Sequence, residues 1–250
     1  MNRTRQKHLL VALILTTLVL LACNITVPQD LGQTVRGSGN VIEESRKVSG
    51  VTAVELATLG NLFIKVSDTE LLRIEAEDNL MEHLESEVRG GKLRIGTQGD
   101  VRLNATRPVN YYLTVTGLDT IVISSSGDIQ APDLEVDQIS VTISSSGDLE
   151  MGVLNADTLK VVISSSGDLD IGRGEVKTQN VNISSSGNYR AKDLASDKAD
   201  VLLNSSGSAT IWVKDSLKAI LNSSGDVRYR GNPTLDVTSN SSGKAVQIGE

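Results

Sequence analysis

The chain has 250 residues, a length that suits one large domain or two small ones, so composition and internal repetition must decide between them. Its net charge of −7 excludes a nucleic-acid-binding protein, which needs a basic surface. Cys23 is the only cysteine, which excludes an intrachain disulfide, a thiolate metal cluster and a cysteine nucleophile in the folded body, and no cofactor is expected.

The first 22 residues have the features of an export signal. Asn2–His8 carries three basic side chains and no acidic one, and Leu9–Ala22 is a mostly apolar run. This run is shorter than the stretch of about 20 apolar residues that a membrane-spanning helix needs. The sequence therefore predicts a signal peptide over residues 1–22.

Cys23 directly follows Leu20-Leu21-Ala22, and this segment resembles the lipobox of bacterial lipoproteins. The resemblance implies that the chain is cut before Cys23 and that its thiol carries diacylglycerol, on the bacterial cell membrane or an outer membrane. An uncleaved anchor with an incidental cysteine is the alternative, and both place the rest of the chain outside the cytoplasm.

Residues 23–36 are expected to form the lipidated N-terminus and a polar tether. Cleavage lowers the lysine and arginine count from 24 to 21 against 31 acidic residues, a net charge of −10. Attraction to anionic lipid is therefore not expected, and the lipid on Cys23 is the predicted membrane contact.

Residues 37–120 are expected to cap a repetitive body. Gly60-Asn61-Leu62 and Gly99-Asp100-Val101 look like decayed copies of a corner that recurs later in the chain, and residues 78–88 have the apolar spacing of a helix of about two turns. A solenoid needs such an irregular terminal unit, because it covers the first coil and blocks edge-to-edge association.

Residues 121–250 repeat a corner of the type Ile-Ser-Ser-Ser-Gly-Asp, first seen at Ile123–Asp128. Successive motif glycines lie 20 residues apart and, in the last two steps, 18 apart. The short alternating runs between turns leave no room for the crossover helix of a βαβ unit. The sequence therefore predicts an all-β fold, a right-handed parallel β-helix with about 20 residues per coil and a short N-terminal capping helix. The motif glycines are Gly127, Gly147, Gly167, Gly187, Gly207, Gly225 and Gly243.

Alternation within each coil predicts which side chains point inward. One aliphatic column is expected before the corner, a second after it and a third on a further face, and the middle serine of each triplet is expected to point inward. The first column is Ile123, Ile143, Ile163, Ile183, Leu203 and Leu221; the second is Ile129, Leu149, Leu169 and Val227; the third face contains Leu134, Leu154, Leu159 and Leu194. The serines are Ser125, Ser145, Ser165, Ser185, Ser205, Ser223 and Ser241.

On these features the chain resembles the GIN-domain family of autotransporter adhesin heads. The resemblance rests on Gly37-Ser-Gly-Asn-Val41, Glu44–Gly50, Gly60–Ile64, Gly90–Ile95 and the repeated Ser-Gly-Asp corners, and covers residues 36–250. It implies a cell-envelope β-helix, often behind a lipoprotein signal, with no assigned catalytic residues. The corners here have Ser-Ser-Ser-Gly-Asp where Ser-Gly-Ser-Gly-Asp is common in the family.

Asp128, Asp148 and Asp168 follow the glycines of successive corners and should stack about 5 Å apart. Such a column could be bridged by a cation such as calcium. The preferred interpretation is that each carboxylate accepts backbone N–H bonds at its turn, because the calcium-binding repeat Gly-Gly-x-Gly-x-Asp is absent.

A polysaccharide-active enzyme is the least favoured class. After cleavage His83 is the only histidine, and no serine has a histidine partner at a plausible position. Tyr189, Trp212 and Tyr229 follow the glycines of consecutive coils and could form an aromatic strip, although packing or surface roles are preferred. The favoured function is a surface module that binds a glycan or an envelope protein, and a self-associating structural protein is the alternative.

Overall fold

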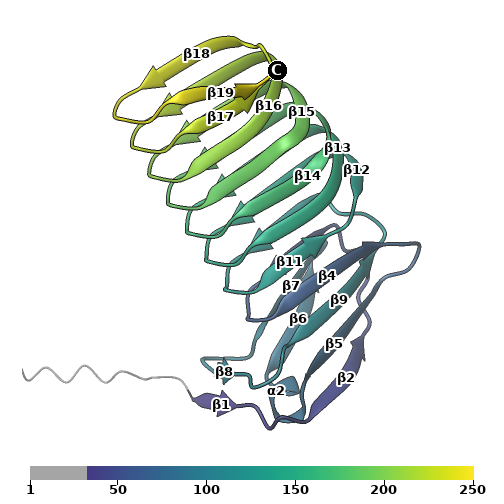
Figure 1. Cartoon of the computed structure of the whole chain (residues 1–250). Coiled ribbons are helices and arrows are strands. Elements are labelled where there is room, and N and C mark those ends of the chain that lie inside the picture. The colour runs from purple at the N-terminus through teal and green to yellow at the C-terminus, as the bar shows by residue number, and fades with distance from the viewer. Residues whose placement is uncertain (1–32) are drawn as a thin grey trace, which may run out of the picture. The chain divides into compact units, whose positions relative to one another are not determined.

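The structure is a computed structural model that describes residues 33–250, in which residues 34–250 form one compact unit. This unit is a solenoid built almost entirely of strands, as the repeat predicts (Figure 1). Before the regular coils come β1 (Thr34–Arg36), β2 (Val41–Arg46), β3 (Ala53–Leu56), β4 (Asn61–Val66), β5 (Leu71–Glu77), α2 (Asp78–Met81), β6 (Leu84–Arg89), β7 (Lys92–Thr97), β8 (Arg102–Asn104) and β9 (Asn110–Val115). The coils contain β10 (Thr120–Ile123), β11 (Asp128–Ala131), β12 (Leu134–Ile143), β13 (Leu149–Ile163), β14 (Leu169–Ile183), β15 (Asn188–Leu203), β16 (Ser208–Leu221), β17 (Val227–Arg230), β18 (Thr234–Ser239) and β19 (Ala245–Gly249).

Successive coils pair in parallel, residue on equivalent residue, and form two main stacks of strand. We call the stack just before the serine triplets the pre-corner side; it contains β3, β10, the ends of β12 to β16, and β18. The stack just after the corner glycines is the post-corner side; it contains β4, β11, the starts of β13 to β16, β17 and β19. The core lies between the two sides.

The two predicted columns beside the corner are confirmed. Ile143 pairs with Ile123 below it and Ile163 above it, and every member of this column is fully buried. In the post-corner column, Tyr189 and Ala209 continue the stack from Leu169 to Val227. These columns hold the coils together, because the burial of each large apolar side chain stabilises the folded state by about 1.5–3 kcal/mol.

The third predicted face divides into two columns. Leu134 pairs with Leu154, and the column continues through Gly174 to Leu194. The assignment of Leu159 to the same face is wrong, because it pairs with Ile139 and belongs to the pre-corner side. The period of two gives only inward or outward direction, and does not show where the chain bends between sides.

The motif glycines are required by close approach between coils. None of them has a positive φ, so a special backbone conformation is not the reason for glycine. A Cβ at Gly147 would lie 2.0 Å from the carbonyl oxygen of Gly127, and the same overlap recurs at Gly167, at 2.2 Å from the oxygen of Gly147. Backbone stacks directly on backbone at every corner, so no side chain fits there.

The middle serines are half-buried at these corners between two exposed polar residues, except for Ser241 in the last coil, which is exposed, so the inward prediction is wrong there. The Ser125 hydroxyl donates to the carbonyl oxygens of Leu56 and Thr58, at 3.3 and 2.6 Å, and the Ser145 hydroxyl donates to the carbonyl of Ser125. These two hydroxyls therefore bind the backbone of the coil below and help to satisfy carbonyl groups at the corner.

The step from 20 to 18 residues per coil occurs between β15 and β16. Ala191 pairs with Ile211, but Ala195 pairs with Trp212, so residues 192–194 have no partner on β16 and the offset falls from 20 to 17. A second shift between Ser196 and Lys198, where Lys198 pairs with Ser216, brings the offset to 18. Such a bulge accommodates residues on one strand without a partner on the next.

The N-terminal region is a cap with mixed strand directions. The coil formed by β3 and β4 lies between β10 and β11 on one side and β7 and β9 on the other. Beyond β7 and β9 the pairing becomes antiparallel, with β6 on β7, β5 on β9 and β2 on β5. Gly60-Asn61-Leu62 stacks under Gly127-Asp128-Ile129, as its sequence predicts.

Two expectations for this cap are wrong. The helix α2 is a single turn, and Leu84 and Val88 belong to β6, because their alternating burial suits a strand whose polar face is exposed. Gly99-Asp100-Val101 is a turn between β7 and β8, and β8 pairs only with β1, outside the corner stack. Residues 33–250 contain no helix with the length and hydropathy of a membrane-spanning segment.

Candidate functional site

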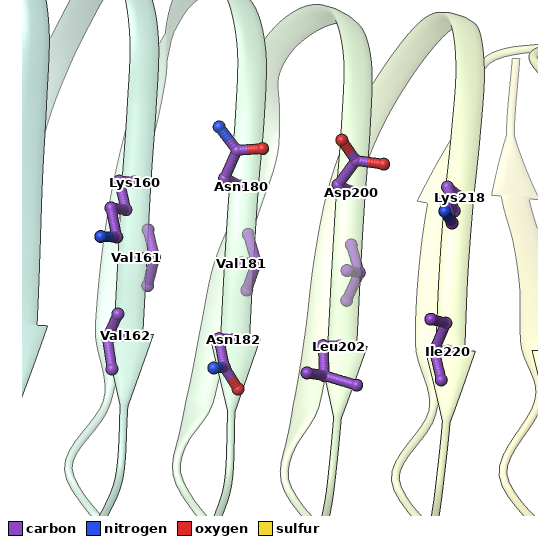
Figure 2. Close-up of a pocket in the computed structure, with 11 residues that line it drawn as sticks. Lys160, Val161, Val162, Asn180, Val181, Asn182, Asp200, Leu202, Lys218 and Ile220 are labelled. Atoms are coloured by element: carbon purple, nitrogen blue, oxygen red, sulfur yellow. The ribbon is translucent and has the colours of Figure 1, made fainter.

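A shallow groove of about 370 Å³ lies on the outer pre-corner face, across β13 to β16 (Figure 2). It is formed by two rows of outward side chains, each contributed by successive coils at the same register position. One row is polar and contains Lys160, Asn180, Asp200 and Lys218. The other is largely apolar and contains Val162, Asn182, Leu202 and Ile220.

Strand alternation creates this groove. Val161 and Val181, between the two rows, point into the core and are buried, so each flanking residue must point outward (Figure 2). Neighbours within a row are one strand spacing apart, about 4.8 Å. The polar row thus offers two ammonium donors, one carboxylate acceptor and one amide that both donates and accepts hydrogen bonds. These groups lie in line beside the largely apolar row.

The predicted aspartate column is present, and its carboxylates bind the next coil. Oδ1 of Asp128 accepts the backbone N–H of Asp148 at 2.9 Å, and Oδ1 of Asp148 accepts that of Asp168 at 2.8 Å. Asp168 continues the pattern to the N–H of Asn188, also at 2.8 Å. Each carboxylate therefore joins two coils, where the sequence suggested a bond within its own turn.

Arg190 closes this column. Its guanidinium lies 2.7 Å from Oδ2 of Asp168 and 3.0 Å from Oδ2 of Asp170. Partial burial would raise the pKa of Asp168, but hydrogen bonds from Arg190 and Asn188 outweigh it and lower that pKa. Among the residues that the structure describes, no group of His, Cys, Asp and Glu side chains has the geometry of a metal site.

The aromatic strip proposed for three consecutive coils does not form. Tyr189 is fully buried, and its hydroxyl donates to Oε1 of Gln179 at 2.7 Å inside the core. Tyr229 is also buried, and only Trp212 reaches the surface, where the guanidinium of Arg230 lies 4.8 Å from its ring centre. Packing accounts for these residues, as the preferred interpretation held.

A different aromatic pair lies on the outer post-corner face of the cap. The rings of Phe63 and Tyr112 stack with centres 5.3 Å apart, and the guanidinium of Arg73 lies 4.0 Å from the centre of the Tyr112 ring. Arg73 also binds Glu43 and Glu75. The sequence carried a signal for this pair, because both residues occupy outward positions of alternating runs, but their register became visible only in the structure.

The remaining candidates from the sequence, His83 and Cys23, are not among the residues that line the groove. His83 follows α2 in the cap, half-buried, with Nε2 3.8 Å from a Glu82 carboxylate oxygen, and it is far along the chain from the serine corners. Cys23 lies outside the described residues. The groove was missed at the sequence level, although Lys160, Asn180 and Asp200 recur at intervals of 20 residues and could have indicated it.

Comparisons with known proteins agree with this architecture. A sequence profile for the family described as "Putative auto-transporter adhesin, head GIN domain" matches residues 51–233. A crystal structure of a putative adhesin from Bacteroides fragilis is similar, with a TM-score of 0.81 and 20% identity over 86% of this chain and 100% of its own. A putative lipid binding protein from Parabacteroides distasonis has a TM-score of 0.69, with 20% identity over 86% and 100% of the two chains. A putative adhesin from Parabacteroides merdae has a TM-score of 0.69, with 18% identity over 87% and 100%. Among curated proteins, none matches the chain.

Proposed function

The chain belongs to the family of adhesin-head GIN domains, and from that membership we propose that it is a non-catalytic binding module displayed on the bacterial cell surface. The observation that carries this proposal is the groove across β13 to β16, an open site that is extended along the solenoid axis. Extended surfaces built from one position per repeat are the usual binding surfaces of repeat proteins.

The proposed ligand is a glycan chain of the cell envelope or a neighbouring cell. Sugar hydroxyls both donate and accept hydrogen bonds. The polar row matches them, because Lys160 and Lys218 donate, Asp200 accepts and Asn180 does both. The apolar strip of Val162, Leu202 and Ile220 suits the C–H faces of sugar rings. An envelope protein with an extended segment is the second candidate, because an extended peptide also has donors and acceptors along its length.

The chemistry of the corners supports binding without catalysis. A serine nucleophile needs a base within hydrogen-bond reach, but the hydroxyls of Ser125 and Ser145 donate to backbone carbonyls. His83 belongs to the cap. Corner serines therefore have a structural role in this proposal.

The membrane contact is proposed to be the diacylglycerol on Cys23, joined to the solenoid by a tether. A single acyl chain gives only marginal membrane binding, whereas two chains anchor a protein stably. The support for this part is the sequence of the leader and the lipobox-like segment.

Glycan-array binding by the full chain in detergent tests the proposed function. We expect selective binding to a subset of glycans, and at least a tenfold loss of affinity, about 1.4 kcal/mol, in the double variant Asn180→Ala/Asn182→Ala. Gln130→Ala removes an exposed amide from the post-corner face and serves as the matched control. Binding that both variants retain would exclude the groove, and the absence of any glycan bound would favour the protein ligand.

A further inference from the structure

A small pocket lies on the outer post-corner face, where β4 of the cap meets the coil strands β11 and β13 (Figure 1). Its volume is about 180 Å³, below the roughly 300–1,000 Å³ of pockets that hold drug-sized ligands, so it suits the head group of a single side chain. The core separates this pocket from the groove on the pre-corner side. Its outward-facing lining residues are Asn61, Phe63, Asp128, Gln130, Asp148 and Glu150.

One wall of the pocket is an aromatic ring. In the strand register, Phe63 lies between Tyr112 and Gln130. The Phe63 ring stacks on that of Tyr112, with centres 5.3 Å apart, and Tyr112 does not line the pocket. The face of Phe63 that is turned away from Tyr112 therefore borders the pocket. Such a face is the negative side of the ring quadrupole and attracts a cation.

The other walls carry carboxylates. Within residues 33–250, Asp128, Asp148 and Glu150 make no ion pair, and no basic residue lines the pocket. Oδ1 of Asp128 and Oδ1 of Asp148 accept backbone N–H groups, which leaves the Oδ2 atoms and the Glu150 carboxylate for a ligand. A positively charged group is the complement of these walls.

The same aromatic stack holds a guanidinium on its other side. The Arg73 guanidinium lies 4.0 Å from the centre of the Tyr112 ring, and its Nη1 lies 2.7 Å from a Glu43 oxygen and 2.6 Å from a Glu75 oxygen. A ring face with flanking carboxylates is therefore a guanidinium site in this protein. The pocket presents the same combination on the Phe63 side of the stack.

The next coil contains a second guanidinium site. Asp168 and Asp170 occupy the register positions of Asp148 and Glu150, one coil later, and they bind Arg190 at 2.7 and 3.0 Å. Arg190 comes from the coil that follows its two carboxylates. The coil that follows Asp148 and Glu150 has Asp170 at that position, so this earlier pair receives no arginine from its own chain.

We propose that this pocket binds an arginine side chain of a partner protein. The guanidinium plane stacks on the free face of Phe63, and its N–H groups donate to the carboxylates of Asp148 and Glu150. Arginine suits these walls better than lysine, because only its planar fork can stack on a ring while it binds two carboxylates. Arginine is also enriched at the centres of protein interfaces. The pocket is separate from the groove, so this proposal does not rest on glycan binding.

Titration with three blocked tripeptides tests the pocket, with arginine, lysine or citrulline between two glycines. Saturation-transfer NMR of the full chain in detergent should give a Kd of about 1 mM for the arginine peptide, as expected of a ligand with few atoms. The lysine peptide should bind about fivefold more weakly, and the uncharged citrulline peptide should not bind. Absence of saturable binding by the arginine peptide, or equal binding of the arginine and lysine peptides, overturns the proposal.

Two variants locate the binding within the pocket. Phe63→Leu removes the ring, and Glu150→Gln removes one carboxylate at nearly constant shape. Each should weaken binding of the arginine peptide by about fivefold while melting as the wild type does. Glu135→Gln, at an exposed position of β12, is the matched control for the charge change and should bind as the wild type does. Binding that both pocket variants retain overturns the proposal.

Filling the pocket from within provides an independent test. Gln130 lies between Phe63 and Glu150 in the register, so Gln130→Arg should raise the melting temperature and block the arginine peptide, and Gln130→Lys should do both less. Unimpaired peptide binding by Gln130→Arg, or tighter binding of glucosamine than of the arginine peptide, overturns an arginine ligand. The groove variant Asn180→Ala/Asn182→Ala should bind the peptide normally, so failure here is distinct from failure of glycan binding.

Discussion

Backbone-to-backbone contact at the corner glycines limits which residues the repeat tolerates. Replacement of Gly147 by alanine should destabilise the fold, because its Cβ would lie 2.0 Å from the carbonyl oxygen of Gly127, which strand pairing holds in place. Overpacking of this kind costs about 1–3 kcal/mol. Thermal or urea unfolding of the variant measures the loss.

The control for this substitution is Gly117→Ala. Gly117 does not have a positive φ and a Cβ there would meet nothing within 4 Å. Alanine at such a position should be neutral or stabilise by about 0.4–1 kcal/mol, because it restricts the unfolded chain. If both substitutions cost the same, helix or strand propensity and not close approach would explain the corner glycines.

Residue by residue, alternation predicted the inward columns well, because a period of two assigns each strand residue to one face. It could not predict Gln179, which is fully buried on the inward side between apolar coils. Its amide is satisfied there by the Tyr189 hydroxyl and by the carbonyl of Leu194, at 2.7 and 3.4 Å. A polar pair of this kind depends on contacts between columns, which the sequence of one strand does not contain.

Among the elements, the turn from β5 into α2 is fixed by one buried carboxylate. Glu77 accepts hydrogen bonds from the backbone of Gly39 and from the backbone and hydroxyl of Thr106, at 2.6, 2.8 and 2.5 Å. The Gly37-Ser-Gly-Asn segment wraps this turn, and a Cβ at Gly37 would overlap the Glu77 carboxylate. The sequence linked the Gly37-Ser-Gly-Asn segment only to a family resemblance, and the structure shows that its glycine makes room for the Glu77 carboxylate.

Acid should therefore weaken the cap. Desolvation would raise the pKa of Glu77, but the bonds from Thr106, Gly39 and Arg107 outweigh it, so the folded-state pKa is below the ordinary value of 4.5. A lowered folded-state pKa stabilises the protein above 4.5, and this stability is lost as the pH falls below 4.5 through the folded-state value. Glu77→Gln should be less stable than the wild type at neutral pH and should lose less stability on acidification.

Chemical denaturation at several pH values measures this difference. The unfolding free energy of Glu77→Gln will still fall with pH, because the pKa values of Glu55, Asp78 and Asp168 are also lowered by their hydrogen bonds. Glu85→Gln, at an exposed position of β6, is the control and should follow the wild type. Parallel pH profiles for Glu77→Gln and the wild type would contradict the role given to Glu77.

The aspartate column makes a separate prediction for the coils. Because Oδ1 of Asp128, Asp148 and Asp168 each accepts a backbone N–H from the next coil, we expect calcium to raise the melting temperature no more than sodium at equal ionic strength. The Asn triple variant, which removes the charges, is the control. A calcium-specific rise that this variant abolishes would instead show a cation ladder.

The cap was the least predictable element. Its antiparallel pairs join strands by contacts that no repeat marks, as in the pairing of Glu43 with Glu75. Residues 84–88 have apolar spacing compatible with a helix, but β6 pairs with β7 along its whole length, and this long-range contact overrides the local pattern.

For the whole molecule, the leader predicts how the chain reaches the membrane. Cys23→Ser should release the protein from the membrane fraction or leave the signal uncleaved, since the residue that would carry lipid is lost. Incorporation of a labelled acyl chain, followed by fractionation, measures both outcomes. Unchanged labelling of the Cys23→Ser protein would refute lipid attachment at this residue.

The position of the β3–β4 coil, between strands that come later in the chain, has a consequence for folding. Ser125 binds Thr58 across 67 residues, whereas later coils meet across 20. The longer loop costs about 1 kcal/mol more in closure entropy. We therefore expect the cap to complete the first coil before that coil acts as a template, and later coils to add one at a time in chain order. Substitutions at the junction of β3 with β10 should slow folding, and those near β18 should speed unfolding instead.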